Sequence, residues 1–234
     1  MPNEKIFIVE DDGKVARDIA ASLEGMGYVV AGQTAQIETA LEQVQQLQPD
    51  LVLMEIRLRG KSSGIDAAQK IHSEFDIPVI FISAHADTLT LQTAMLAQAY
   101  GMIFKPFDAR ELKSQITMAL YKHSMARKLR ESEERYALAV RAANDGIWDW
   151  NLKTNEIYYS SRWKEMLGCK EDQVGSAPNE WFKRVHPDDY KQVQADLVAH
   201  IKGLTPHFEC EYRMQHSNGA YFWVLSRGLA VRDA

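Results

Sequence analysis

The chain has 234 residues, 46% of them hydrophobic and 25% charged, a composition typical of soluble globular proteins. Its formal net charge of -5 argues against nucleic acid as a partner, because phosphate binding requires a basic surface. No apolar run is long enough to cross a bilayer, and the N-terminus does not resemble a signal peptide. Cys169 and Cys210 show neither metal-binding nor disulfide spacing. These features predict a reduced, cytoplasmic protein with no membrane or nucleic-acid partner.

The first half of the chain alternates short apolar runs with helical periodicity. Strands are predicted at 6–9, 28–31, 51–54, 78–82 and 102–104. Helices are predicted at 15–23, 37–47, 65–75 and 87–99, with Thr34 capping the second and a loop at 60–64. Because strand and helix alternate with short links, we expect a doubly wound α/β domain. Its five parallel strands would be joined by right-handed crossovers, with helices on both faces.

Polar residues stand where these strands end. They are Glu10, Asp11, Glu55, Ser83 and Lys105. The carboxyl ends of parallel strands share one edge of a sheet, so we expect these side chains to gather there. Three acids beside a lysine and a hydroxyl suit a Mg²⁺ ion and a phosphoryl group. The alternative is that they are separate loop acids and helix caps.

Four motifs in this half resemble the receiver domain of two-component response regulators, over residues 3–122. They are Ile6-Phe-Ile-Val-Glu-Asp-Asp12, Pro49-Asp-Leu-Val-Leu-Met-Glu-Ile-Arg-Leu58, Phe81-Ile-Ser-Ala84 and Gly101-Met-Ile-Phe-Lys-Pro-Phe107. The resemblance implies that Mg²⁺ is bound by Glu10, Asp11, the side chain at position 55 and the carbonyl of Arg57. It implies that Ser83, Ala84 and Lys105 receive the phosphoryl group, supplied by a histidine kinase or phosphotransfer protein. It also implies a cis peptide between Lys105 and Pro106.

Two positions depart from the receiver pattern. The phosphoacceptor is normally Asp and here is Glu55, while the switch position on the fifth strand is normally aromatic and here is Met102. A shift of about 1 Å at a reacting centre costs roughly 10²-fold in rate, so Glu55 is expected to be a poor acceptor and to weaken Mg²⁺ binding.

The longer arm of Glu55 carries a carboxylate toward Lys105 and Ser83. It would partly imitate a phosphorylated residue, with one charge in place of about -1.5 to -2. We therefore hypothesise that Glu55, whether natural or introduced, gives an activated-like receiver without phosphate. The alternative is that Glu55 pairs with Lys105 and changes nothing else.

A helical connector is predicted over 108–143, because no Gly or Pro interrupts the chain until Gly146. Its apolar positions follow two phases: Leu112, Ile116, Ala119 and His123, then Met125, Leu129, Ser132, Tyr136, Ala139 and Ala143. A seam that changes phase is compatible with a discontinuous two-stranded coiled coil, so a parallel homodimer is expected. The alternative is a single solvated helix packed on its own domains.

The last part, 144–234, predicts a smaller domain with an antiparallel sheet. Strands at 146–152 and 157–160 form one hairpin, and helices follow at 162–167 and 187–201. A second hairpin turns at Asn218-Gly219. A two-residue turn there would pair Met214 with Trp223, Tyr212 with Leu225, and Phe208 with Leu229.

Motifs in this part resemble the PAS sensor domains of sensor kinases and diguanylate cyclases, over about residues 132–234. They are Glu131-Ser-Glu-Glu-Arg-Tyr136, Ala143-Asn-Asp-Gly-Ile-Trp-Asp-Trp150, Val185-His-Pro-Asp-Asp189 and Tyr221-Phe-Trp-Val-Leu-Ser-Arg-Gly228. The resemblance implies an α+β fold but identifies no ligand, since Trp148, Trp150 and Trp223 suit a core as well as a pocket. It also implies one more central strand after Ala234, so the sequence is expected to be a fragment lacking that strand. An incomplete sheet, or one filled by another chain, are the alternatives.

Together these features predict a homodimeric two-component signalling protein, with a receiver, a helical connector and a PAS domain. The sequence contains no nucleophile with a base, nucleotide loop or kinase motif, so we expect a regulator and not an enzyme. Two alternatives stay open. The chain could be the regulatory part of a larger enzyme, such as a histidine kinase or diguanylate cyclase, or a purely structural dimerisation module.

Overall fold

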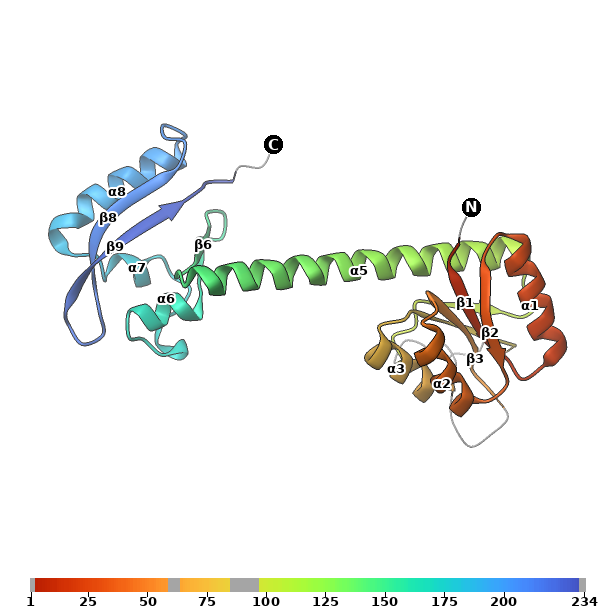
Figure 1. The fold of residues 1–234 in the computed structure, drawn as a ribbon. Coiled ribbons are helices and arrows are strands. Elements are labelled where there is room, and N and C mark those ends of the chain that lie inside the picture. The colour runs from red at the N-terminus through yellow and green to blue at the C-terminus, as the bar shows by residue number, and fades with distance from the viewer. Residues whose placement is uncertain (1–2, 59–63, 85–96, 232–234) are drawn as a thin grey trace. The chain divides into compact units, whose positions relative to one another are not determined.

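The computed structural model describes residues 3–58, 64–84 and 97–231 (Figure 1). It divides into two compact units, Met1–Ser132 and Glu133–Ala234. Residues 60–63 of the predicted loop and most of the helix predicted at 87–99 lie outside the described residues. No helix in the described part of the chain is both long and apolar enough to span a membrane.

The first unit is built on a five-stranded parallel sheet in the order β2-β1-β3-β4-β5. The strands are β1 (Lys5–Val9), β2 (Val29–Thr34), β3 (Leu51–Glu55), β4 (Val79–Ser83) and β5 (Gly101–Phe104). The helices are α1 (Gly13–Gly25), α2 (Ile37–Leu47), α3 (Gly64–Phe75) and the start of α5 (Ala109–Ala143). This is the doubly wound fold that the alternating sequence predicts.

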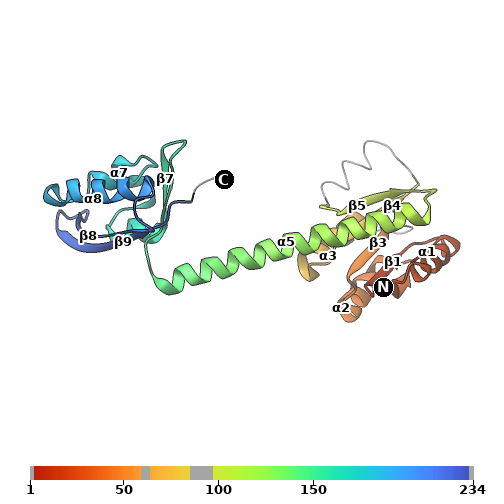
Figure 2. The ribbon, with the colours of Figure 1, turned by 90° about the horizontal axis from the view of Figure 1, so that it is seen from above.

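The sheet separates two hydrophobic cores. In β1, Ile6 and Ile8 pack with α1 and α5, while Phe7 and Val9 pack with α2 and α3. Successive side chains of a strand point to opposite faces, and a strand buried on both faces is therefore apolar throughout. The continuous apolar runs of β1, β3 and β4 thus follow from the two layers of helices (Figure 2).

Two details of the second strand and helix differ from the sequence prediction. Strand β2 continues to Thr34, which pairs with Val9, so this strand is longer than predicted. Thr34 does not cap α2. The N-cap residue is Gln36, and the Thr34 hydroxyl oxygen instead accepts the Gln36 backbone N–H at 3.2 Å. The threonine therefore shapes the turn that precedes the helix.

The long helix α5 begins at Ala109, one residue after the predicted start at Asp108, and runs through Ala143 as predicted. The Asp108 carboxylate accepts the Glu111 backbone N–H at 2.8 Å, which satisfies a free donor of the first turn. Only its first turns are buried, through Leu112, Ile116 and Ala119. The boundary between the two compact units falls inside this helix, after Ser132.

The second unit contains two separate two-stranded antiparallel sheets, β6-β7 and β8-β9. Its elements are β6 (Trp148–Asn151), β7 (Glu156–Tyr159), α6 (Ser161–Met166), the 3-10 turn η1 (Glu171–Gln173), α7 (Asn179–Phe182), α8 (Pro187–Ile201), β8 (Phe208–Gln215) and β9 (Tyr221–Gly228). Trp181 lies at the centre of the core, and its indole N–H donates to the Tyr212 hydroxyl at 2.8 Å. A buried indole needs such a partner, so this bond fixes α7 against β8.

The register predicted for the last hairpin was wrong by one residue. Met214 pairs with Phe222, Tyr212 with Val224 and Phe208 with Gly228. The His216 N–H donates to the Ala220 carbonyl at 2.8 Å, which leaves a three-residue loop in which Gly219 has a φ of 90°.

A one-residue slip exchanges the faces of a strand. Phe222 and Val224 therefore pack on the core of the second unit, and Trp223 is 68% exposed. The Trp223 ring instead lies 5.5 Å from the Arg213 guanidinium.

Arg213 of β8 also holds the start of α8. Its backbone N–H and two guanidinium nitrogens donate to Asp189 at 2.9, 2.9 and 2.7 Å. These bonds lower the pKa of Asp189 to about 2. A carboxylate with a depressed pKa stabilises the fold above its unfolded pKa of about 3.9, and this stabilisation is lost as the pH falls through about 2.

We expect Asp189→Asn to lower the unfolding temperature of the second unit by about 2–4 °C at pH 7, with the difference from the parent chain closing near pH 2. Thermal unfolding followed by circular dichroism at both pH values measures this. The matched control is Glu209→Gln, which breaks the exposed pair between Arg227 and Glu209 and should shift the temperature by less than about 1 °C. Equal shifts for the two variants would contradict this role of Asp189.

Candidate functional site

Four strands of the parallel sheet place polar residues at one edge. Glu10 directly follows β1, Glu55 ends β3, Ser83 ends β4, and Lys105 directly follows β5. Strand β3 lies between β1 and β4 (Figure 2), so Glu55, the last residue of β3, is at the middle of this edge. Glu10, Glu55 and Ser83 are only 4%, 6% and 1% exposed. Buried carboxylates require a charged or hydrogen-bonding partner, so these residues are not separate, solvent-exposed loop acids.

Lys105 is the partner of both carboxylates. Its Nζ donates to Glu10 Oε2 at 2.6 Å and to Glu55 Oε2 at 2.6 Å. Burial alone would lower the pKa of Lys105, but the hydrogen bonds and negative charges of Glu10 and Glu55 outweigh it and raise the pKa above its ordinary value. The ammonium therefore stays charged and bridges the two acids.

The second oxygen of each carboxylate is held by backbone. Glu10 Oε1 accepts the Asp12 N–H at 3.1 Å, and Glu55 Oε1 accepts the Arg57 N–H at 3.3 Å. Both carboxylates are thus fixed at two points, one to the lysine and one to the chain just after their own strand. Arg57 was predicted to bind Mg²⁺ through its backbone carbonyl. The structure shows in addition that its backbone N–H contacts Glu55.

Asp12 is a residue to which the sequence assigned no role. Its side chain caps α1 by accepting the N–H groups of Lys14 and Val15 at 2.8 and 3.3 Å, while its own N–H holds Glu10. An Asp immediately before a helical periodicity is the sequence signal for such a cap. Asp12 therefore links the start of α1 to the orientation of the Glu10 carboxylate.

The other predicted site residues lie on or beside the same strands. The Lys105 N–H donates to the Ser83 carbonyl at 2.8 Å, and the peptide between Lys105 and Pro106 is cis, as predicted. Ala84 follows Ser83 and is exposed. Met102 pairs with Phe81 across β4 and β5 and packs, partly buried, against the core beneath α2 and α3.

The predicted Mg²⁺ ligands are not assembled around a common point. Among the described residues, no group of three or more His, Cys, Asp or Glu side chains is arranged to hold a metal ion. Glu10 and Glu55 do meet, but around the ammonium of Lys105, which supplies the positive charge that a divalent cation would bring. Lys105 therefore occupies an oxygen of each carboxylate, and the predicted Mg²⁺ set of Glu10, Asp11, Glu55 and Arg57 stays a prediction.

Comparison with known families identifies both units. Residues 6–117 match the response regulator receiver domain, and residues 156–234 match the PAS fold. This chain contains a response regulator receiver domain followed by a PAS domain. Both matched domains are regulatory, non-catalytic folds, and receiver domains generally bind Mg²⁺ at their phosphorylation site.

Individual relatives agree with this assignment. The chain is 33% identical over 128 residues to the phyllosphere-induced regulator PhyR of Methylorubrum extorquens, covering 53% of this chain and 46% of PhyR. It is 28% identical over 212 residues to the uncharacterised transcriptional regulatory protein YrkP of Bacillus subtilis, covering 88% of this chain and 89% of YrkP.

The DNA-binding response regulator MtrA of Mycobacterium tuberculosis is 31% identical over 119 residues. Apart from YrkP, the chain spans about half the length of these curated relatives. The signal receiver domain of a modulated diguanylate cyclase from Desulfovibrio desulfuricans is 31% identical, with a TM-score of 0.51. It covers 53% of this chain and 99% of that structure.

We expect Glu55→Asp to respond to Mg²⁺ more strongly than the parent chain, because the shorter side chain releases its oxygens from Lys105. Ligands that bind only the folded state raise its stability with concentration. In thermal unfolding with and without about 10 mM MgCl₂, the unfolding temperature of the Asp variant should rise by about 3 °C and that of the parent by less than about 1 °C.

The matched control is Glu209→Asp, which makes the same substitution at an exposed position of the second unit. It should leave the response to Mg²⁺ unchanged. A parent chain that gains as much stability from Mg²⁺ as the Glu55→Asp variant would show that Lys105 does not compete with the cation.

Proposed function

We propose that Glu55 holds the receiver in an activated-like state without phosphorylation, and that α5 relays this state to the PAS domain. The observation that carries the proposal is the contact of Lys105 Nζ with Glu55 Oε2 at 2.6 Å. In the receiver pattern this lysine receives a phosphoryl oxygen. Here it is already bound to the side chain that stands at the acceptor position.

The chemistry of Glu55 supports imitation more than acceptance. Phosphoryl transfer requires the attacking oxygen to be aligned with the donor, and positioning supplies most of the rate. Glu55 has both oxygens engaged, by Lys105 and by the Arg57 N–H. Its single charge replaces only part of the roughly -1.5 to -2 of a phosphorylated residue, so the imitation is partial.

The helix α5 is fixed at both ends, as a relay requires. In the receiver, Leu112 and Ile116 are fully buried. At the PAS end, the Arg162 side chain donates to the Asn144 carbonyl at 3.3 Å, just after the last helical residue. Gly146 lies so close to Trp163 that an added Cβ would be 2.7 Å from the Trp163 Cα. The chain therefore leaves the helix in a fixed conformation against α6.

The exposed part of α5 supports a homodimer. Large apolar side chains lie exposed along it at Met118, Tyr121, Met125, Leu129, Tyr136 and Leu138. Met125, Leu129 and Tyr136 belong to the second predicted phase, whereas Leu138 lies off that seam. A stripe of this kind on an otherwise charged helix is the surface that a second copy covers in a coiled coil. We propose a parallel homodimer through α5 and the PAS domain.

The PAS domain has room for one more strand. Within the described residues β6 pairs only with β7, and β9 pairs only with β8. A hollow of about 570 Å³ is lined by β6, by Leu197 and His200 of α8, and by the end of β9. Open strand edges leave backbone groups unpaired, so we propose that a further strand fills this hollow. No ligand is proposed for the PAS domain.

The proposed setting is the cytoplasm, with a histidine kinase or phosphotransfer protein upstream and no nucleic acid or membrane as partner. The similarity of the receiver to that of a modulated diguanylate cyclase favours one alternative, in which these domains regulate a catalytic domain of a larger enzyme. The exposed stripe on α5 would equally serve a structural dimerisation module that has lost phosphoryl signalling.

We expect the parent chain to take up no phosphoryl group from acetyl phosphate, and Glu55→Asp to gain about 80 Da on the intact protein, because only the shorter acid leaves Lys105 free to receive the incoming phosphoryl oxygens. Intact-mass spectrometry measures this. If neither chain takes up a phosphoryl group, the alternative of a structural dimerisation module is favoured. Uptake by the parent would contradict the proposal that Glu55 does not accept a phosphoryl group.

The activated-like state is tested separately by oligomeric state. Sedimentation should show the parent chain to be as dimeric as phosphorylated Glu55→Asp and more dimeric than the unphosphorylated variant. Glu209→Asp should match the parent, because the exposed Glu209 lies in the PAS domain and takes no part in the site. A parent chain that matches the unphosphorylated variant would contradict the activated-like state.

A further inference from the structure

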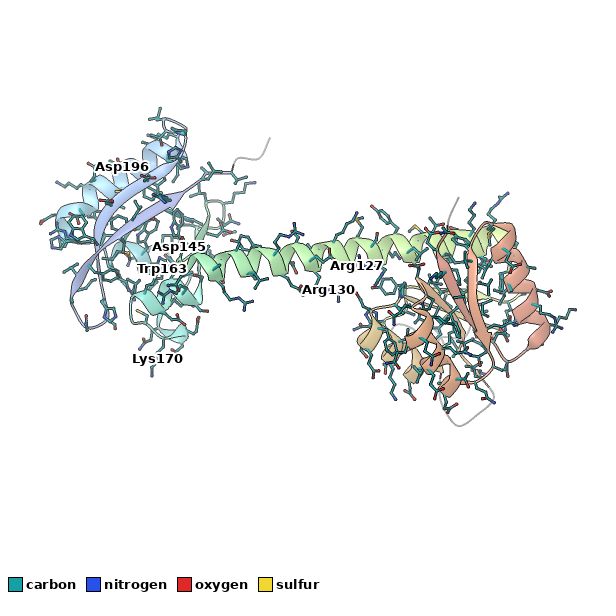
Figure 3. All side chains as sticks on the ribbon, viewed as in Figure 1. Arg127, Arg130, Asp145, Trp163, Lys170 and Asp196 are labelled. Carbon is teal, nitrogen blue, oxygen red and sulfur yellow. The ribbon has the colours of Figure 1, made fainter. Side chains whose placement is uncertain are left out.

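The receiver holds α5 at a second place, beyond the buried turns. The Asp76 carboxylate contacts two residues of this helix. The distances are 3.3 Å from Oδ1 to His123 Nε2, 3.1 Å from Oδ1 to Arg130 Nη2, and 3.3 Å from Oδ2 to Arg130 Nη2. All three residues belong to the first compact unit. Figure 3 labels Arg130 and its neighbour Arg127 on the helix.

Asp76 projects from a fixed piece of backbone between α3 and β4. Its φ of 53° lies in the left-handed region, which Asp and Asn adopt more readily than other non-glycine residues. Its N–H donates to the His72 carbonyl at 3.1 Å, which closes the end of α3. The backbone of Asp76 is therefore fixed by local structure that does not depend on α5.

A row of rings reinforces the contact. The His72 and Tyr100 rings meet edge to face at 5.7 Å, and the Tyr100 and His123 rings at 5.4 Å. Tyr100 is fixed in turn, because its N–H donates to the Val79 carbonyl at 2.9 Å. We call Asp76, His72, Tyr100, His123 and Arg130 the base clamp.

The base clamp extends the part of α5 that moves with the receiver. Core packing ends at about Ala119, whereas Arg130 lies about 11 residues farther along, roughly 16 Å at 1.5 Å per residue. Burial would raise the pKa of Asp76, but the hydrogen bonds and charges of His123 and Arg130 outweigh it and lower the pKa. The carboxylate is thus ionised, and its bonds to the helix are charge-assisted.

The base clamp also lies at the beginning of the strands that end in the functional site. Strand β4 starts at Val79, three residues after Asp76, and ends in Ser83. Strand β5 starts directly after Tyr100 and leads to Lys105. The backbone path from the site to the base clamp is therefore short, with seven positions from Ser83 to Asp76 and five from Lys105 to Tyr100.

We propose that Asp76 is the positioning residue that couples the receiver to α5, by fixing the direction in which the helix leaves the domain. This inference rests on the proposed relay through α5. Removing the Asp76 charge should release the helix from about residue 120 onward and leave the site at the opposite edge of the sheet intact.

The test is hydrogen exchange of the full-length chain, followed by mass spectrometry of peptides from α5. Asp76→Asn keeps a side chain that tolerates the left-handed conformation, so the variant retains the turn. Exchange over 120–132 should rise about fivefold, while exchange over 109–119 stays unchanged.

Two neighbouring arginines provide a matched pair of variants. Arg130→Gln removes the contact with Asp76 and should reproduce the Asp76→Asn effect. Arg127→Gln removes the same charge but breaks only the exposed pair with Glu131 inside the helix, so 120–132 should exchange as in the parent. Unchanged exchange in both Asp76→Asn and Arg130→Gln, or an equal rise in Arg127→Gln, would overturn the proposal.

A second comparison separates this inference from the proposed function. If α5 relays the state of the site, hydrogen exchange over 133–143 should differ between the parent and Glu55→Asp. Introducing Asp76→Asn into both chains should abolish that difference. No difference between the parent and Glu55→Asp would contradict the relay, yet the effect of Asp76→Asn on 120–132 would still decide the base clamp. A difference that persists in Asp76→Asn would overturn the coupling role of Asp76.

Discussion

The receiver depends on one buried ammonium between two buried carboxylates. Two acids at adjacent strand ends repel each other and lose hydration, and Lys105 offsets both costs. Breaking such a group by removing one partner leaves a buried charge uncompensated, which is far more costly than the loss of an exposed pair. The lysine therefore fixes Glu10, Glu55 and the ends of β1, β3 and β5 in a single arrangement.

Because Lys105 bridges the two acids, the extra methylene that distinguishes Glu55 from Asp is important. One Glu55 oxygen binds the lysine while the other oxygen accepts the Arg57 N–H. An acceptor engaged at both oxygens is poorly placed for attack, and an ammonium bound to two acids has less need of a cation nearby. In our proposal, this one change in side-chain length affects phosphoryl acceptance, metal binding and the state of the receiver together.

The edge of the sheet opposite the candidate site holds the helix α5. Asp76 holds α5 where β4 and β5 begin, and the functional site lies where the same strands end. Strands β3 and β4 are buried throughout, and a close-packed core of this kind is stiff. In the proposed relay, a change at Lys105 would reach α5 without a contact between the site and the helix. The Asn144–Arg162 contact fixes the residue just after α5 to α6.

The sequence predicted the receiver well because each of its signals is local. Each element is predicted by one local signal: an apolar run ending in an acid, a lysine before a proline, or an uninterrupted helical periodicity. The parallel fold then brings Glu10, Glu55, Ser83 and Lys105 to one edge of the sheet. The last hairpin was misread because Asn218-Gly219 suits a two-residue turn, whereas the His216–Ala220 bond makes a three-residue loop. The base clamp could not be predicted, since it joins residues 47 and 54 positions apart through tertiary contact.

The most direct test of the central interaction is the titration of Lys105 itself. Its ¹³Cε resonance can be followed by NMR in the full chain and assigned by its loss in Lys105→Arg. We expect the pKa of Lys105 to lie above the ordinary value for lysine in the parent chain and to be clearly lower in Glu55→Gln, because one of the two carboxylates that stabilise the ammonium loses its charge. The same midpoint in both chains would contradict a Glu55 carboxylate bound to Lys105.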